Sequence, residues 1–387
     1  MAVSVSVGVS DELDPVEAFD LAAAQAAGGL GGRCDLAIIF VGAPHLAHAK
    51  AILSTVHERL EPRALIGCGA GGVLGGGREL ESGPGAAVWA LSAPQARIST
   101  HHLQAEPGDG GIAVRGLPEP ERLGEVLFLL ADPYTFSAEA LLESLNAERP
   151  GMPVLGGLAS AAAAGSASLF RDGEVLAGGA VAASRGGVGV IPCVSQGATP
   201  VGPEMTITAS DGNVIAELAS KPAIERLREA IGDLDPRQQT LAAQGLMLGI
   251  VIDENQPAYE RGDFLVRPIL GADPDSGSLA VGERVRIGQI VRMHVRDGAT
   301  ADEDLRQALQ TQALALGDEG AAGALLFTCN GRGSHMFDVP DHDATALEDA
   351  LGVPTAGFFC AGEIGPVGGR NFLHGFTATI AVFPRAG

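Results

Sequence analysis

The feature that most constrains the fold is an order of strand, helix, strand, loop and strand that occurs three times along the chain. At its first occurrence, the apolar run 35–40 precedes an amphipathic helix, and apolar strands at 64–69 and 86–91 follow. Because a helix crosses from the first strand to the second, these two strands can run parallel. The pattern predicts an α/β fold with mixed sheets.

The second and third occurrences repeat this order with similar spacing, and Ser137 is the expected N-cap of the second helix. Their strands are expected at 125–130, 153–160, 177–183, 323–327, 355–365 and 376–383. We therefore expect 35–91, 125–183 and 323–383 to superpose as strand–helix–strand–loop–strand units.

The middle segment, 186–320, does not follow this order and is rich in strands. Its apolar runs predict strands at 189–194, 205–210, 246–253, 263–270 and 286–297, and helices at 222–231 and 302–316. The run SQGATPVGP, at 195–203, is typical of a boundary. We therefore expect two domains, 1–200 and 201–387.

Composition limits the partners and the location. A formal net charge of −22 repels nucleic-acid phosphates, so no nucleic-acid partner is expected. The 5 cysteines are odd in number and lack CxxC spacing, which favours a reducing, cytoplasmic location. The uncharged stretch 151–170 consists mainly of glycine, alanine and serine, so no membrane span is expected.

Two motifs have both a functional and a structural interpretation. GCGAGG (67–72) matches a dinucleotide fingerprint, but the glycines at 75–77 disfavour the helix that such a site needs. The stretch 335–343 has metal-binding residue types without a diagnostic spacing. These residues are His335, Asp338, Asp341, His342 and Asp343. We expect Asp341 or Asp343 to cap the following helix, and no bound metal.

Cysteine and histidine residues suggest two alternative functions. Cys360, Glu363 and His374 could act as nucleophile, orienting carboxylate and base of a small-molecule enzyme. However, Cys360 stands in an apolar strand, where cysteine is typically a small buried hydrophobe, so no catalytic residues are expected. His294 or His374 could ligate haem, although a structural role is the simpler interpretation of His294 and no cofactor is expected.

The candidate binding site follows two strands of the third unit. CNGRG (329–333) comes after one strand and AGEIGP (361–366) after the other. Ligands of parallel sheets bind beyond the C-terminal ends of the strands, so we expect Asn330, Arg332 and Glu363 to converge on a small-molecule ligand. The structural alternative is an Arg332–Glu363 ion pair that binds nothing.

Four more residues complete the predicted pocket. Gly333 allows the loop to bend so that the arginine faces the ligand. The segment RNFLHGFT (370–377) adds a wall formed by Asn371, His374 and Thr377.

These motifs resemble the FIST family. The C-terminal FIST domain is similar to LLFTCNGRG together with AGFFCAGEIGPVGGRNFLHGFTATIAVF. The N-terminal FIST domain is similar to ALIGCGAGGVLGGGRELESGPGAAVWAL (64–91) and PVLGGLAS (153–160). The resemblance covers nearly the whole chain.

The resemblance implies a sensory, small-ligand-binding module of intracellular signal transduction. Amino acids or similar metabolites are the ligands proposed for the family, and some bacterial members are haem proteins that sense nitric oxide. Relatives are fused to kinase or cyclase modules in bacteria and to an F-box in eukaryotes. This sequence has no room for such a module, so its output is expected to pass through a separate signalling protein.

Overall fold

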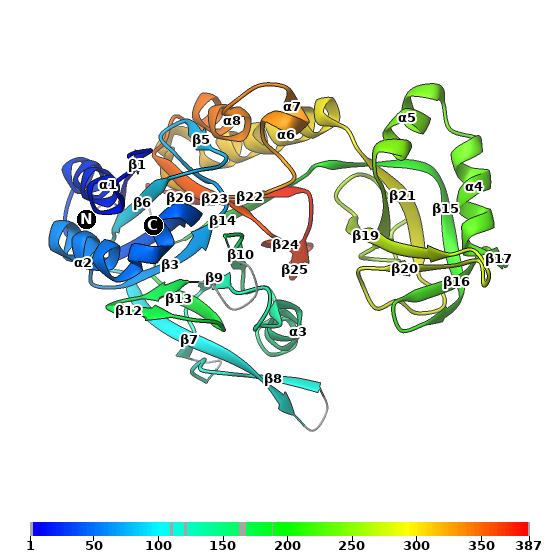
Figure 1. Cartoon of the computed structure of the whole chain (residues 1–387), viewed down its shortest axis with the longest axis horizontal. Helices are drawn as coiled ribbons and strands as arrows, with labels where there is room; N and C mark the ends of the chain where they lie inside the picture. The colour runs from blue at the N-terminus through cyan, green and yellow to red at the C-terminus, as the bar shows by residue number, and fades with distance from the viewer. Residues whose placement is uncertain (1–2, 109–110, 120–121, 162–167, 188, 386–387) are drawn as a thin grey trace. The chain divides into compact units, whose positions relative to one another are not determined.

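The computed structural model describes residues 3–108, 111–119, 122–161, 168–187 and 189–385. Its helices and strands in mixed sheets confirm the α/β class (Figure 1). The chain forms two compact units. The first comprises Met1–Val194, Leu305–Leu373 and Thr377–Gly387, and the second comprises Ser195–Asp304 and His374–Phe376. The division into domains 1–200 and 201–387 stays a prediction.

The first unit contains three sheets, and each is built around a trio of strands with the same order. In every trio, the first two strands along the chain are parallel and the third pairs antiparallel with the first. The trios, in chain order, are β2 (Leu36–Gly42), β3 (Leu65–Ala70) and β6 (Ala86–Ser92); β9 (Val126–Ala131), β10 (Val154–Leu158) and β13 (Ala180–Gly186); and β22 (Ala321–Cys329), β23 (Thr355–Cys360) and β26 (Thr377–Pro384). The superposition of the whole segments stays a prediction.

The trios exchange hairpins. The hairpin that follows the second strand of each trio pairs with the second strand of another trio, so no sheet is complete by itself. β4 (Val73–Gly75) and β5 (Arg78–Leu80) join β23, β11 (Leu169–Arg171) and β12 (Glu174–Leu176) join β3, and β24 (Glu363–Val367) and β25 (Arg370–His374) join β10. The opposite edges are formed by β1 (Ser4–Ser10), β7 (Arg97–Gly108) with β8 (Gly111–Arg115), and β14 (Ile191–Gln196).

One glycine recurs at the same place in each trio. A Cβ added there would lie 2.5 Å or less from a carbonyl oxygen of the parallel neighbour, closer than real Cβ atoms approach. The glycines and the residues whose carbonyls they face are Gly67 and Ile39, Gly156 and Leu129, and Gly357 and Leu326. Glycine is therefore required at these positions because the backbones approach closely.

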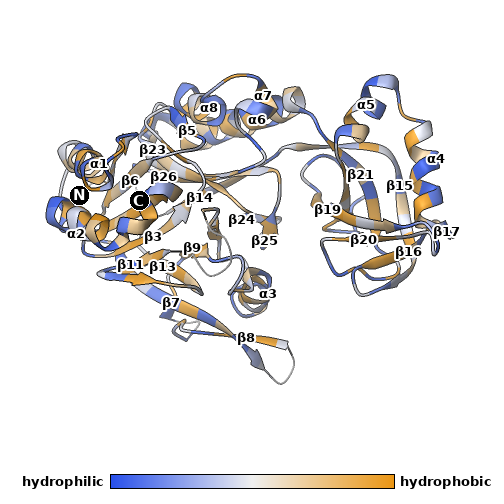
Figure 2. Cartoon of the chain, in the orientation of Figure 1, coloured by the Kyte–Doolittle hydropathy of each residue, from blue (hydrophilic) through white to orange (hydrophobic). Residues whose placement is uncertain are grey.

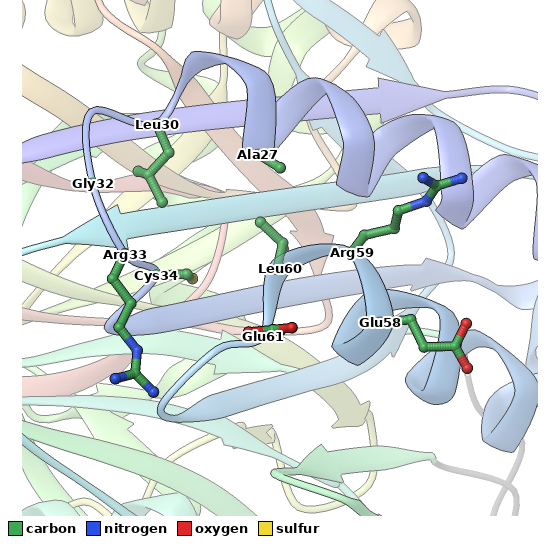
Figure 3. A pocket seen from close by; sticks show the side chains of 9 residues that line it. All are labelled: Ala27, Leu30, Gly32, Arg33, Cys34, Glu58, Arg59, Leu60 and Glu61. Atoms are coloured by element: carbon green, nitrogen blue, oxygen red, sulfur yellow. The ribbon is translucent and has the colours of Figure 1, made fainter.

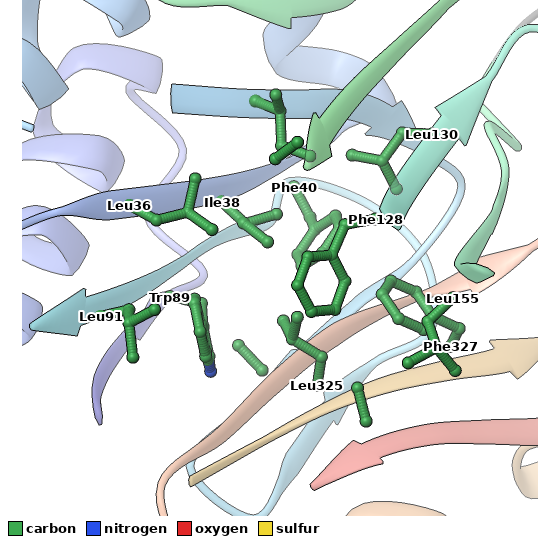
Figure 4. Packing of buried hydrophobic residues seen from close by; sticks show 14 of the residues in the cluster. Leu36, Ile38, Phe40, Trp89, Leu91, Phe128, Leu130, Leu155, Leu325 and Phe327 are labelled. Atoms are coloured by element: carbon green, nitrogen blue, oxygen red, sulfur yellow. The ribbon is translucent and has the colours of Figure 1, made fainter. Parts of the chain in front are cut away.

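The inner faces of the three sheets share one hydrophobic core (Figure 4). Aromatic rings from different trios meet there, since Phe40 stacks on Phe358 with ring centroids 5.0 Å apart and Phe128 stacks on Phe383 at 5.8 Å. Helices cover the outer faces, as the alternation of polar and apolar colours along them indicates (Figure 2). These helices are α1 (Pro15–Gly29), the 3-10 turn Ala43–His48 with α2 (Ala49–Leu60), α3 (Ala138–Glu148), α6 (Gly298–Leu316) and α8 (His342–Leu351).

The second unit is an antiparallel barrel. Its sheet closes because β15 pairs with both β21 and β16. The barrel strands are β15 (Ala198–Asp211), β21 (Ile290–Arg296), β18 (Leu246–Val251), β19 (Phe264–Asp273), β20 (Ser278–Val281) and β16 (Val214–Leu218), with the short β17 (Lys221–Pro222) beside β16. Helices α4 (Ala223–Gly232) and α5 (Pro236–Gln244) contribute side chains to its core. No helix in the described ranges is both long and apolar enough to span a bilayer.

Candidate functional site

The loops after β22 and β23 leave the sheet side by side. The two strands are parallel and in register up to Cys329 and Cys360, and Asn330 N donates to Cys360 O at 2.9 Å. Arg332 N then donates to Cys329 O at 2.9 Å, so the chain turns at once. This turn directs the Arg332 side chain into the protein, where the residue is only 1% exposed.

The guanidinium of Arg332 pairs with Asp343, at the start of α8. Arg332 Nε lies 2.7 Å from Asp343 Oδ2, and Nη2 lies 2.8 Å from Oδ1, which is the bidentate geometry of strong arginine–carboxylate pairs. Burial alone would raise the pKa of Asp343, but the charge and hydrogen bonds of Arg332 hold it well below its usual range. The pair therefore stays charged in the interior.

Other side chains fix this ion pair. Thr328 Oγ1 donates to Asp343 Oδ2 at 2.6 Å, and His342 Nδ1 lies 2.9 Å from Oδ1. The ring of Phe337, in the short helix α7 (Ser334–Phe337), stacks on His342 with a centroid separation of 3.5 Å. Arg332 Cζ lies 5.0 Å from the centre of the same Phe337 ring. The arginine is thus held by a carboxylate and an aromatic face.

The expectation that Asp341 or Asp343 caps α8 is wrong. Asp341 occupies the N-cap position, but its Oδ1 accepts from Glu79 N at 2.6 Å. The amide of Ala344, in the first turn, donates instead to Glu79 Oε1 at 2.9 Å. Glu79 belongs to the exchanged hairpin β4–β5, so the cap comes from a segment that is distant in sequence.

Glu363 is fully buried at the start of β24, and it forms no ion pair with Arg332 within 4 Å. Its Oε2 accepts from Thr377 N at 3.1 Å and from Thr377 Oγ1 at 2.9 Å. Burial raises the pKa of Glu363 to about 8, although the Thr377 bonds, the charge of Arg332 and the thiol of Cys329 favour the carboxylate. Much of Glu363 therefore carries a proton at neutral pH.

Arg332 and Glu363 each retain an unused polar atom. Arg332 Nη1 and Glu363 Oε1 are buried and have no hydrogen-bond partner among the described residues. The two groups are near enough for each charge to favour the charged form of the other. Buried polar atoms are rarely left unsatisfied, so this pair of atoms is the strongest sign of a binding function at this edge.

The other residues of the predicted pocket have different surroundings. Asn330 is exposed at the tip of the loop. Gly333 has a φ of +94°, and a Cβ there would lie 2.9 Å from the carboxylate of Glu81, which accepts from Ser334 N at 2.7 Å. His374 is buried and belongs to the short segment grouped with the second unit. Of the predicted set, the structure connects Glu363 with Thr377 directly.

The amide of Asn371 is used within the protein. Its Oδ1 accepts from Val154 N at 2.8 Å, its Nδ2 donates to Met152 O at 2.8 Å, and its backbone pairs with Asn146. These bonds attach the exchanged hairpin β24–β25 to β10 and α3. Asn371 is therefore a link between trios, a role that its position in the sequence did not indicate.

The residues considered for metal or haem do not form a ligand group. His335 and Asp338 are exposed, and the described part of the chain has no group of three or more potential ligands placed to hold a metal ion. His294 is buried in β21 with its ring 4.8 Å from that of Phe264, and a Cβ on Gly249 would touch its imidazole. Burial lowers the pKa of His294 to about 4.

The sulfur of Cys360 is not activated. The residue is fully buried, and burial together with the charge of Glu363 raises its pKa well above the usual value, whereas nucleophilic cysteines have a lowered pKa. The run 67–72 continues from β3 into the strand β4, and no helix starts there to hold a dinucleotide. A surface hollow of about 550 Å³ near Arg33, Cys34 and Glu58 contains none of the predicted site residues (Figure 3).

Comparison with known proteins identifies the family. The FIST N domain matches residues 35–221, and the FIST C domain matches residues 223–366. The chain belongs to the FIST family. FIST domains are generally sensor domains of signal transduction. An uncharacterized protein of Mycobacterium tuberculosis is 44% identical over 98% of this chain and 99% of its own length. A second uncharacterized protein, from Mycobacterium bovis, is 42% identical over 98% of both chains.

Proposed function

We propose that this FIST protein is a cytoplasmic sensor that binds a small polar metabolite beyond the ends of β22 and β23. One observation carries the proposal: Arg332 Nη1 and Glu363 Oε1 are buried without hydrogen-bond partners among the described residues, and the two side chains act electrostatically on each other. A ligand with one acceptor and one donor group would satisfy both atoms. Amino acids meet this requirement, since they carry a carboxylate and an ammonium group.

Asp343 supports this role because it orients the arginine without using all of its donors. The carboxylate binds Nε and Nη2, which leaves Nη1 as the remaining nitrogen for a ligand. Thr377 acts similarly on Glu363, since both of its bonds go to Oε2 and leave Oε1. Side chains held in this way lose little rotamer freedom when a ligand binds.

The raised pKa of Glu363 gives the ligand a way to change the protein. A ligand ammonium beside Oε1 would favour the carboxylate, so binding would release a proton and convert a neutral group into an ion pair. Such a change at the start of the exchanged hairpin β24–β25 is a local signal that a separate output protein could detect. No nucleic acid or membrane takes part in this scheme.

Calorimetric titration with a panel of L-amino acids tests the proposal. We expect a saturable signal in the native protein and at least tenfold weaker binding in Glu363→Gln, which keeps the shape but loses the charge. Arg332→Lys should weaken the same ligand by about 1–3 kcal/mol, the value of a charged hydrogen bond. Glu143→Gln is the matched control, because it makes the same change at an exposed carboxylate of α3 outside the predicted site. Unchanged affinity in both Glu363→Gln and Arg332→Lys would place the pocket elsewhere.

A further inference from the structure

A second polar group lies at the other end of the strands, away from Arg332 and Glu363. Arg185 is near the end of β13, opposite Val126 at the start of β9. Its guanidinium lies over the ring of Phe383, which is opposite Gly323 near the start of β22. Arg332 lies three residues after β22 ends, whereas Phe383, which contacts Arg185, is opposite the start of β22. The two arginines therefore lie toward opposite ends of β22.

The guanidinium of Arg185 is fully buried and has no acceptor among the described residues. Its exposure is 0%, and Nε, Nη1 and Nη2 all lack a hydrogen-bond partner. The other buried arginines of the described chain each have a carboxylate, Asp343 for Arg332 and Glu283 for Arg267. Burial lowers the pKa of Arg185 to about 10, although the charge of Glu125 favours the cation, so the side chain is still charged at neutral pH. Glu125 accepts no hydrogen bond from the guanidinium, and a buried cation without a directly paired acceptor destabilises a fold.

Aromatic side chains compensate this charge only in part. Arg185 Cζ lies 5.1 Å from the centre of the Phe383 ring, and the Trp89 ring lies 4.8 Å from that of Phe383. A cation–π contact stabilises the charge but satisfies no N–H group. Trp89 Nε1 is also buried without a partner among the described residues, and Trp89 lies opposite Ile38 and next to Leu91 (Figure 4). Arg185 and Trp89 thus both contact the Phe383 ring, and both have buried donors without a hydrogen-bond partner among the described residues.

The fold itself does not require a charge at this position. The three trios have an equivalent position in their first strand, three residues before the residue whose carbonyl faces the recurrent glycine. This position is occupied by Leu36, Val126 and Gly323. Their antiparallel partners are Leu91, Arg185 and Phe383, respectively. Two of the three equivalent positions thus hold apolar side chains that complete the core. The arginine at the remaining position, in the second trio, calls for another explanation.

We propose that Arg185 and Trp89 bind a small oxyanion, a carboxylate, carbonate or phosphate group, at this end of the core. The planar guanidinium matches two oxygens of such a group, and the indole N–H adds a third donor. The anion supplies the hydrogen-bonded counter-charge that Arg185 does not receive from Glu125. This site is independent of the ligand proposed for Arg332 and Glu363.

Trp89 provides a direct test, because it is the single tryptophan of the chain. Acetate and phosphate are titrated at constant ionic strength with chloride as the balancing ion, while Trp89 emission and the melting temperature are followed. Samples are equilibrated for hours, because a fully buried site exchanges by local opening. We expect a saturable change in emission and a melting temperature that rises with anion concentration. A response to acetate alone identifies a carboxylate ligand, and a response to both identifies a general oxyanion site.

Three variants separate the interpretations. Arg185→Leu, which restores the side chain found at Leu91, should lose the saturable response, and Arg185→Lys should bind at least tenfold more weakly because it lacks the planar fork. The control Arg115→Leu changes an exposed arginine on β8 and should respond like the native chain. The proposal is overturned if native protein shows no saturable response, or if Arg185→Leu and Arg185→Lys both retain it. Higher stability of Arg185→Leu at every anion concentration would also contradict it.

Discussion

Replacing Asp343 with asparagine tests the buried ion pair that orients Arg332. The side chains of Arg332 and Asp343 are 0% and 2% exposed, so water cannot screen the charge that remains. Asparagine keeps the size of the side chain but removes the negative charge. In the native protein, that charge lies 2.7 Å from Arg332 Nε and 2.8 Å from Arg332 Nη2. Breaking one partner of a buried pair costs about 3–5 kcal/mol, and we expect Asp343→Asn to lower the free energy of unfolding by this amount.

Urea unfolding at pH 7, followed by Trp89 fluorescence, measures this change in the first unit. Asp20→Asn is the matched control, because its pair with Arg59 is 36% and 50% exposed and should contribute little to stability. The double variant Arg332→Met with Asp343→Leu should lose less stability than Asp343→Asn, because no unpaired charge is left inside. A loss below about 1 kcal/mol for Asp343→Asn would refute the assignment of a tightly coupled pair.

The same variant predicts a change in acid sensitivity. Because Arg332 lowers the folded-state pKa of Asp343, the pair stabilises the native state above the unfolded pKa of about 3.9, and this contribution is lost as pH falls toward the folded value. The acid limb of the stability curve should therefore be flatter in Asp343→Asn. An unchanged acid limb would show that Asp343 titrates normally in the folded protein.

Three further outcomes follow from the described contacts. Burial raises the folded pKa of Glu363 to about 8, so protonated Glu363 stabilises the fold fully below the unfolded pKa of about 4.3, and this contribution is lost as pH rises from there through 8. Glu363→Gln should abolish this decline, measured as the urea midpoint against pH. Gly357→Ala should cost at least about 1–3 kcal/mol because its Cβ would meet Leu326 O, whereas Gly173→Ala, in open space, should cost almost nothing; equal costs would contradict the close approach. Asn371→Ala should lower the melting temperature through about 1–3 kcal/mol of lost buried hydrogen bonds, and an unchanged melting temperature would mean that these bonds are not formed.

The local pattern was sufficient to predict the helix that follows Ser137 and most strands of the three trios. However, the expected strand 355–365 is divided into β23 and β24, which belong to different sheets. The side chain of Ser137 accepts from Ala140 N, as the capping signal indicated. Helix α5 was missed although its capping box, Asp235 with Gln238, is a readable signal. Residue spacing predicts such elements because the interactions that start and end them are local.

The hairpin exchange could not be predicted, because the strands that pair are far apart in sequence. β4 pairs with β23, and the carboxylate that caps α8 comes from Glu79 on the same hairpin. The partner of Arg332 was missed for a similar reason: the loop and α7 between Arg332 and Asp343 decide which carboxylate reaches the guanidinium. The presence of an inward-facing arginine was readable from the sequence, whereas its partner required the tertiary structure.

Native mass spectrometry of gently purified protein tests most directly whether Arg332 and Glu363 hold a ligand. Native protein and Glu363→Gln are purified in parallel and their masses compared under conditions that keep noncovalent complexes intact. We predict that native protein retains a small molecule of defined mass and that Glu363→Gln loses it while remaining folded. The same retained mass at the same occupancy in both proteins would contradict a ligand that contacts Glu363.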